Sequence, residues 1–238
     1  AIVEADDDGT YVLKFRGAGQ GPKALIAELV AGEIARAASL PVPEIVFVEL
    51  DPELARTEPD PEIQELIRAS AGLNLALDYL PGAVTFDPVA WKPDADFASS
   101  VVWFDAYATN VDRTVRNTNM LVWHRRLWLI DHGAAFYFHH AWSNVLERSR
   151  DPFPMIKNHV LLEFAGSLPE ADARMTRLIT AEIIHSVVGL IPDAWLMGDS
   201  PFEGSTRHRA AYAEYLLSRL EQPHAFLVEA IRARTLHV

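Results

Sequence analysis

Hydrophobic and polar residues follow two rhythms along the first part of the chain. Thr10–Phe15 and Ile45–Leu50 are short runs rich in β-branched and aromatic residues, a pattern typical of strands. Between them, Ala24–Ala38 carries apolar residues near helical spacing, and the two prolines of Leu40–Pro43 stop the helix. The pattern predicts two strands separated by one long amphipathic helix.

The character of the chain changes near Asp87. Residues 51–72 are acidic and rich in proline, with room for one short helix, and Leu73–Leu80 is predicted to be a strand that ends at a Pro-Gly turn. Val101–Thr109 fits strand or helix by propensity, and its length and position favour a buried helix. Strands and helices therefore alternate before Asp87.

A polar loop and a short hairpin lead into the last part of the chain. Residues 110–119 are almost all polar, and Met120–Val122 and Leu127–Ile130 are predicted strands around a His-Arg-Arg turn. The helical patterns that follow lie near residues 155–166, 170–189, 205–220 and 223–235. The chain as a whole is predicted to be an α+β protein.

Composition and charge narrow the class of protein. Hydrophobic residues make up 50% of the chain, enough to form a core. The net charge of −12 argues against direct contact with nucleic acid, because phosphate binding needs lysine and arginine. There is no cysteine, which excludes disulfides, thiolate metal sites and cysteine nucleophiles. With no secretory signal or membrane span visible in the sequence, we expect a cytoplasmic protein without a membrane partner.

The most informative polar residues lie between Asn110 and Gly133. Asp112 is followed five positions later by Asn117 on the polar loop, and Asp131 follows the second strand of the hairpin. Phosphoryl transfer needs a carboxylate beside the acceptor hydroxyl and oxygen ligands that hold magnesium on the nucleotide phosphates. Asp112 can supply the base, and Asn117 and Asp131 can supply two metal ligands. Such a small ligand set suits magnesium, which keeps water and phosphate oxygens in its shell.

Two upstream residues complete this pattern. Lys14 lies inside an apolar strand, where a lysine is unfavourable unless its ammonium meets an anion. Glu28 lies early on the next helix, where it can pair with Lys14 and orient it toward phosphate oxygens. Taken alone, Lys14 could extend along an edge strand into solvent, and Glu28 could be a solvated helix residue. Together with Asp-x4-Asn and Asp-x-Gly, they occur in the order that kinases use.

Three stretches resemble one known family, the HipA-like kinases, a bacterial branch of the protein-kinase and phosphoinositide-kinase superfamily. Glu28–Pro43 resembles its glutamate-led helix with a "GLPVP"-type turn. Asp112–Asn117 resembles its catalytic loop, and the sequence LIDHG at 129–133 resembles its metal-binding aspartate motif. The resemblance covers about residues 10–140 and does not extend piece by piece to the helical last hundred residues.

This resemblance implies a two-lobed kinase-like fold that uses ATP and Mg²⁺. We expect a small β-rich nucleotide-binding lobe over residues 1–87 and a larger, mainly helical catalytic lobe over residues 88–238, with the nucleotide between them. The resemblance further assigns the site residues. Lys14 would bind the ATP phosphates, Glu28 would anchor Lys14, and Asp112 would be the catalytic base, while Asn117 and Asp131 would bind the metal.

Two further segments are candidates for nucleotide contacts. Asp78, Tyr79 and Leu80 lie where the connection between the lobes would meet adenine, through backbone groups. Gly19 and Gly21 belong to a glycine-rich loop that follows the lysine strand, whereas kinases place their phosphate-covering loop before it. This loop could cover the phosphates or form an ordinary flexible turn.

The sequence departs from the kinase pattern in several places. Asn110-Val111 stands where kinases have His-Arg before the catalytic Asp, so the loop must be braced in another way. His132 replaces the phenylalanine of the DFG motif, and Asn119 is a second amide that could ligate metal in place of Asn117. The residues before Lys14 have room for one strand where kinases have two. We therefore expect either further upstream sequence or a partner that supplies N-terminal strands.

Other polar residues have two interpretations each. Arg113 and Arg116 flank Asp112 and could neutralise phosphate or be surface charges. His132, His139 and His140 could suggest a metal site, but no cysteine is near, and packing beneath the cleft is the better interpretation.

The function predicted from these features is ATP- and Mg²⁺-dependent phosphorylation of a serine or threonine hydroxyl on a protein. Two alternatives stay open. The chain could be a regulatory module that binds nucleotide without turnover. It could also be a small-molecule kinase with a small alcohol as acceptor, because antibiotic and sugar phosphotransferases share the Asp-x4-Asn…Asp arrangement.

Overall fold

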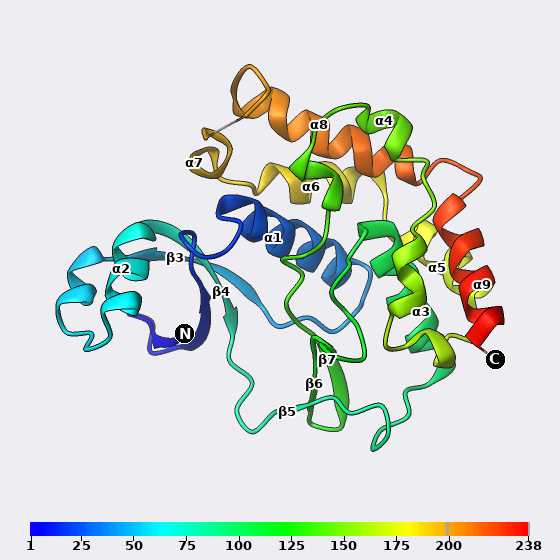
Figure 1. The fold of residues 1–238 in the computed structure, drawn as a ribbon, viewed down its shortest axis with the longest axis horizontal. Coiled ribbons are helices and arrows are strands. Elements are labelled where there is room, and N and C mark those ends of the chain that lie inside the picture. The colour runs from blue at the N-terminus through cyan, green and yellow to red at the C-terminus, as the bar shows by residue number, and fades with distance from the viewer. Residues whose placement is uncertain (199, 238) are drawn as a thin grey trace.

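The computed structural model describes residues 1–198 and 200–237, which form a small sheet-containing lobe and a larger helical lobe (Figure 1). The strands are β1 (Ile2–Glu4), β2 (Thr10–Lys14), β3 (Ile45–Leu50), β4 (Gly72–Asp78), β5 (Val84–Thr85), β6 (Met120–Trp123) and β7 (Arg126–Leu129). The helices are α1 (Pro22–Ala37), α2 (Pro61–Ala69), α3 (Ala95–Ala108), α4 (Val145–Arg148), α5 (Leu168–Leu178), α6 (Ala181–Gly189), α7 (Asp193–Leu196), α8 (Gly204–Arg219) and α9 (Ala225–His237). This is the predicted two-lobed α+β fold.

The sheet of the small lobe has the strand order β1-β2-β4-β3, and every neighbouring pair is antiparallel. Strands β2, β3 and β4 confirm the three strands predicted in this region. The short β1 was not predicted, and it pairs Ile2 with Val12 and Glu4 with Thr10. Lys14, opposite Leu75 of β4, is the last residue of β2, so its side chain leaves the sheet next to the glycine-rich loop.

Helix α1 is buried on more of its surface than an amphipathic helix would be. It packs against the sheet strands β3 and β4 and also against α6 and α7 of the helical lobe, between which it lies in Figure 1. Residues on all of its faces are therefore buried, including Glu28 at 1% exposure. Because α1 packs against elements of both lobes, its position is fixed relative to each of them.

Helix α3 forms the centre of the helical lobe. It is the buried helix predicted around Val101–Thr109, and it begins earlier because the Asp94 side chain caps it by accepting a hydrogen bond from the Asp96 N–H at 3.0 Å. It packs against α5 and α9. The polar loop at residues 110–119 follows directly, with the β6–β7 hairpin after it, as predicted.

Four helices were predicted after residue 150. The predictions for the first two were wrong, and α8 and α9 confirm the other two. The predicted helix over 155–166 is two short 3-10 turns, Pro154–Asn158 and Leu162–Phe164. The predicted helix over 170–189 is divided into α5 and α6, because Thr180 caps a new helix with its hydroxyl. Among the described residues, no helix combines the length and apolar character needed to cross a membrane.

Candidate active site

Lys14 lies between two carboxylates that are distant in sequence. Its Nζ is 2.8 Å from Asp131 Oδ1 and 3.9 Å from Glu28 Oε2. Burial alone would lower the pKa of Lys14, but the charges of Glu28 and Asp131 outweigh it and raise the pKa above the ordinary value. The ammonium is thus held in its charged form, with Glu28 as its predicted helix partner.

Glu28 has a second partner, His132. The two side chains are almost fully buried, and His132 Nδ1 lies 3.5 Å from Glu28 Oε1. Burial opposes the charge of Glu28, yet the nearby His132 and Lys14 lower the pKa of Glu28 to about 2. The His132 ring also packs edge-on against Phe104, with centroids 6.4 Å apart. The imidazole therefore takes the apolar place expected of a phenylalanine and adds a polar contact to α1.

Asp112 is oriented by the two amides of its loop. Its Oδ2 accepts hydrogen bonds from Asn117 Nδ2 at 2.7 Å and Asn119 Nδ2 at 3.2 Å. The amide of Asn119 also reaches the backbone oxygen of Asp131 at 3.5 Å, which ties the loop to the end of β7. Asn119 is buried at 7% exposure, whereas Asn117 is exposed. Of these two amides, Asn117 is the better placed to meet a metal ion.

The loop is braced by Asp105, a fully buried residue of α3. Its carboxylate accepts hydrogen bonds from Arg113 Nε at 2.6 Å, His159 Nε2 at 2.9 Å and Asn110 Nδ2 at 3.1 Å. Burial opposes its charge, but Arg113 and His159 hold the pKa of Asp105 well below its usual range. This cluster does the bracing that a His-Arg pair would have done.

Arg113 is neither a surface charge nor a phosphate ligand. It is 1% exposed, and its Nη1 donates to the backbone oxygens of Asn119 and, at 3.3 Å, Ile130. Both interpretations offered by the sequence were therefore wrong, because the arginine turns inward. The sequence analysis singled out neither Asp105 nor His159, although Asp105 is the one acid within the apolar run Val101–Thr109.

The glycine-rich loop lies beside Lys14. A cavity of about 210 Å³ is lined by Lys14, Gly19, Glu28 and Asp131 among others. Gly19 has φ +54 and open space where a side chain would be, whereas Gly21, with φ +65, caps the start of α1. The loop thus faces the same cavity as the lysine even though it follows β2.

The base of this loop is anchored to the segment that leads into β4. Gly17 N–H donates to Ser70 Oγ at 3.0 Å, and a Cβ on Gly17 would lie 2.9 Å from that oxygen. Asn74 is fully buried and accepts a hydrogen bond from the Arg16 N–H at 2.7 Å. Gly17 is therefore required for close packing, and the sequence did not reveal Ser70 or Asn74.

Asp78 ends β4, and Tyr79 and Leu80 follow it on the chain that leads to β5 and connects the lobes (Figure 1). The N–H groups of Asp78 and Tyr79 donate to the backbone oxygens of Glu44 at 2.8 Å and Thr10 at 3.0 Å. An adenine ring at this segment would therefore have to use other backbone groups. None of the three residues lines the cavity around Lys14.

The candidate metal ligands are few. Among the described residues, no group of three or more histidines or acids is arranged to bind a metal without other ligands. Asn117 offers an amide oxygen, and Asp131 offers a carboxylate whose side chain is 47% exposed. This donor set fits Mg²⁺, whose remaining ligands are phosphate oxygens and water. His139 packs in the core, its Nδ1 3.0 Å from the Tyr212 hydroxyl, and His140 is exposed.

Two comparisons with known proteins found similarities to this chain. The sequence profile described as HipA-like kinase matches residues 2–227. The crystal structure of a Helicobacter pylori proinflammatory kinase, CtkA, superimposes with a TM-score of 0.59 at 16% identity, covering 100% of this chain and 94% of that one. At that identity the likeness shows a shared fold. No curated protein sequence matches the chain significantly. Because the profile spans nearly all of its length, the chain belongs to the family of HipA-like kinases.

Proposed function

We propose that this chain is an ATP- and Mg²⁺-dependent protein kinase that phosphorylates a serine or threonine hydroxyl. The observation that carries the proposal is the meeting of Lys14, Glu28 and Asp131, with Lys14 Nζ 2.8 Å from Asp131 Oδ1 and 3.9 Å from Glu28 Oε2. Binding of nucleotide phosphates requires a lysine that a buried carboxylate holds in place, beside an aspartate that binds the metal. Asn119 links this group to Asp112 through its contact with the Asp131 backbone.

Each residue of the site has one role in this proposal. Lys14, held by Glu28, and the N–H groups around Gly19 bind phosphate oxygens. Asn117 and Asp131 hold Mg²⁺, which neutralises charge on the phosphates. Asp112, oriented by the two amides, accepts the proton of the acceptor hydroxyl while the hydroxyl oxygen forms its bond to the γ-phosphorus and the bond to ADP breaks.

The test is phosphate transfer from labelled ATP by the wild-type chain and by Asp112→Asn. We expect Asp112→Asn to abolish transfer and to leave nucleotide affinity within a few-fold, because Asp112 acts as base and does not ligate the metal. Asp6→Asn is the matched control, because Asp6 is exposed on the small lobe. Equal transfer by Asp112→Asn and wild type would remove Asp112 from the mechanism.

The identity of the phosphate acceptor distinguishes a protein kinase from the two alternative functions. Autophosphorylation or transfer to added protein supports the proposal, whereas transfer only to small alcohols would replace it with a small-molecule kinase. Binding of ATP with no transfer to any acceptor would identify a regulatory module.

A further inference from the structure

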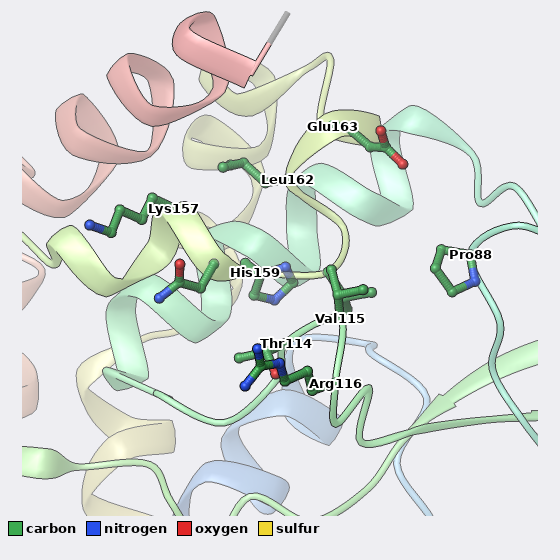
Figure 2. Close-up of a pocket in the computed structure, with 10 residues that line it drawn as sticks. Pro88, Thr114, Val115, Arg116, Lys157, His159, Leu162 and Glu163 are labelled. Carbon is green, nitrogen blue, oxygen red and sulfur yellow. The ribbon is translucent and has the colours of Figure 1, made fainter.

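The catalytic loop borders a pocket that shares no lining residue with the cavity around Lys14. This pocket, which we call the loop pocket, has a volume of about 620 Å³. Its lining includes Pro88, Thr114, Val115 and Arg116 on one side and Lys157 and His159 on the other (Figure 2). Thr114, Val115 and Arg116 lie between Asp112 and Asn117 in the sequence, so part of the wall of the pocket is the catalytic loop itself.

The walls of the loop pocket are fixed relative to Asp112. Thr114 pairs with His159 in an isolated antiparallel bridge, and the Val160 N–H donates to the Arg113 oxygen at 3.2 Å. The Thr114 N–H also donates to the backbone oxygen of Asp112 at 2.9 Å. A ligand in this pocket would therefore be held at a defined place beside the base.

A second hollow of about 400 Å³ adjoins the loop pocket. Both are lined by Pro88, Val115 and Arg116, and the second hollow is also lined by Asn117 and Asn119, the two amides that bond to Asp112. The loop pocket and this hollow together form what we call the loop groove. It runs past the side chains of Asn117 and Asn119, which donate hydrogen bonds to Asp112.

The loop groove is lined by two cations, Arg116 and Lys157, and by two acids, Glu163 and Asp87. The chain carries a net charge of −12, yet Arg116 and Lys157 are exposed at the loop pocket. Within the described part of the chain, neither side chain belongs to any ion pair. The pKa of Glu229 is lowered most by Arg232, which donates hydrogen bonds to its carboxylate at 2.6 and 2.8 Å, and least by the charge of Lys157.

The acidic residue of the loop pocket stands apart from Lys157. Figure 2 shows Glu163 and Lys157 on opposite sides of the pocket, with His159 between them. Between these charges, Val115 is 69% exposed and offers an apolar contact. The groove thus presents an exposed apolar residue and two cations, with Arg116 on the side of the catalytic loop and Lys157 on the facing side.

The direction of phosphoryl transfer indicates what the groove binds. The acceptor oxygen and the departing ADP lie roughly in line on opposite sides of the transferred group, so the acceptor approaches from the side away from the nucleotide. We propose that the loop groove binds the segment of a protein substrate around its phosphorylated hydroxyl, and that Arg116 and Lys157 select an acidic side chain there. This inference rests on the proposed kinase function.

The test uses peptides with one central serine in an alanine background. A single glutamate or a single lysine is placed at each of the three positions on either side, and kcat/KM is measured for each peptide. We expect wild type to prefer glutamate at one or more positions. Arg116→Glu and Lys157→Glu should each shift the glutamate-to-lysine ratio by about two- to fivefold toward lysine, the range of a partly exposed ion pair. The preference should weaken as salt is added.

Arg68→Glu is the matched control, because Arg68 is exposed on α2 in the other lobe and undergoes the same change of charge. The glutamate-to-lysine ratio of kcat/KM for Arg68→Glu should equal that of wild type. A ratio compares two peptides on one protein, so partial loss of folded enzyme does not alter it. The inference is overturned if peptides are phosphorylated with the same ratio by wild type, Arg116→Glu and Lys157→Glu, a result that leaves the kinase function intact. No transfer to any peptide or protein would refute the kinase function itself.

Discussion

Replacing Asp105 by asparagine should destabilise the protein far more than the loss of an exposed charge. Asp105 and Arg113 both have fully buried side chains, and the pair is joined at 2.6 Å. The substitution keeps the size of the side chain and removes its charge, so the Arg113 guanidinium stays in the core without a carboxylate. Asparagine keeps one side-chain oxygen, so it cannot accept from Asn110 at the Oδ1 position and from His159 at the Oδ2 position at the same time.

The size of the effect follows from burial. Removing one partner of a buried ion pair costs about 3–5 kcal/mol, whereas an exposed pair is worth roughly 0–1 kcal/mol. A loss of about 3–5 kcal/mol is a large part of the roughly 5–15 kcal/mol that holds a domain folded, and it corresponds to a fall in Tm of roughly 6–20 °C for a chain of this size. Arg113 also holds the backbone at Asn119 and Ile130, so kcat should fall together with stability.

The assay is urea unfolding, with Glu221→Gln as the control. Glu221 pairs with Arg150 at 2.9 Å, but both side chains are mostly exposed, at 60% and 72%. The double variant Asp105→Asn with Arg113→Met should recover part of the loss, because it leaves no buried charge behind. If Asp105→Asn costs no more than Glu221→Gln, the buried network does not brace the loop as described.

Three further predictions concern the lysine site and the buried histidines. Lys14→Met should raise the KM for ATP more than Glu28→Gln does, and a double-mutant cycle should give a coupling of about 0.5–3 kcal/mol; strict additivity would mean that the two charges do not interact. His132→Phe removes the imidazole 3.5 Å from Glu28 Oε1, so we expect a several-fold rise in the KM for ATP with an unchanged circular dichroism spectrum; an unchanged KM would contradict a role for His132 in holding Glu28. Burial lowers the pKa of His139 and His159 below the ordinary 6.5, so the unfolded chain takes up these protons first and the free energy of unfolding should decrease as the pH falls below about 6.5. Equal urea midpoints at neutral and mildly acidic pH would refute this.

Local features of the sequence were enough to predict the elements that hold the site. Strand β2 with Lys14, helix α1 with Glu28, and the polar loop before the β6–β7 hairpin are each visible within a few residues, because their apolar periods and turn residues act over short distances. The order of Asp112, Asn117 and Asp131 is equally local, and it carried the resemblance to kinases.

Contacts between distant residues decided the rest. Arg113 turned inward because Asp105 of α3 meets it in the core, and His159 joins the same carboxylate from 54 residues away. The predicted helix over 155–166 fails because the Val160 N–H bonds to the Arg113 oxygen of the loop and not to a carbonyl one turn back. Glu28 meets His132 only because the segment after β7 lies against α1. Periodicity reports which residues face inward. Which buried charge meets which partner is set by packing between segments far apart in the chain, and that information exists only in the tertiary structure.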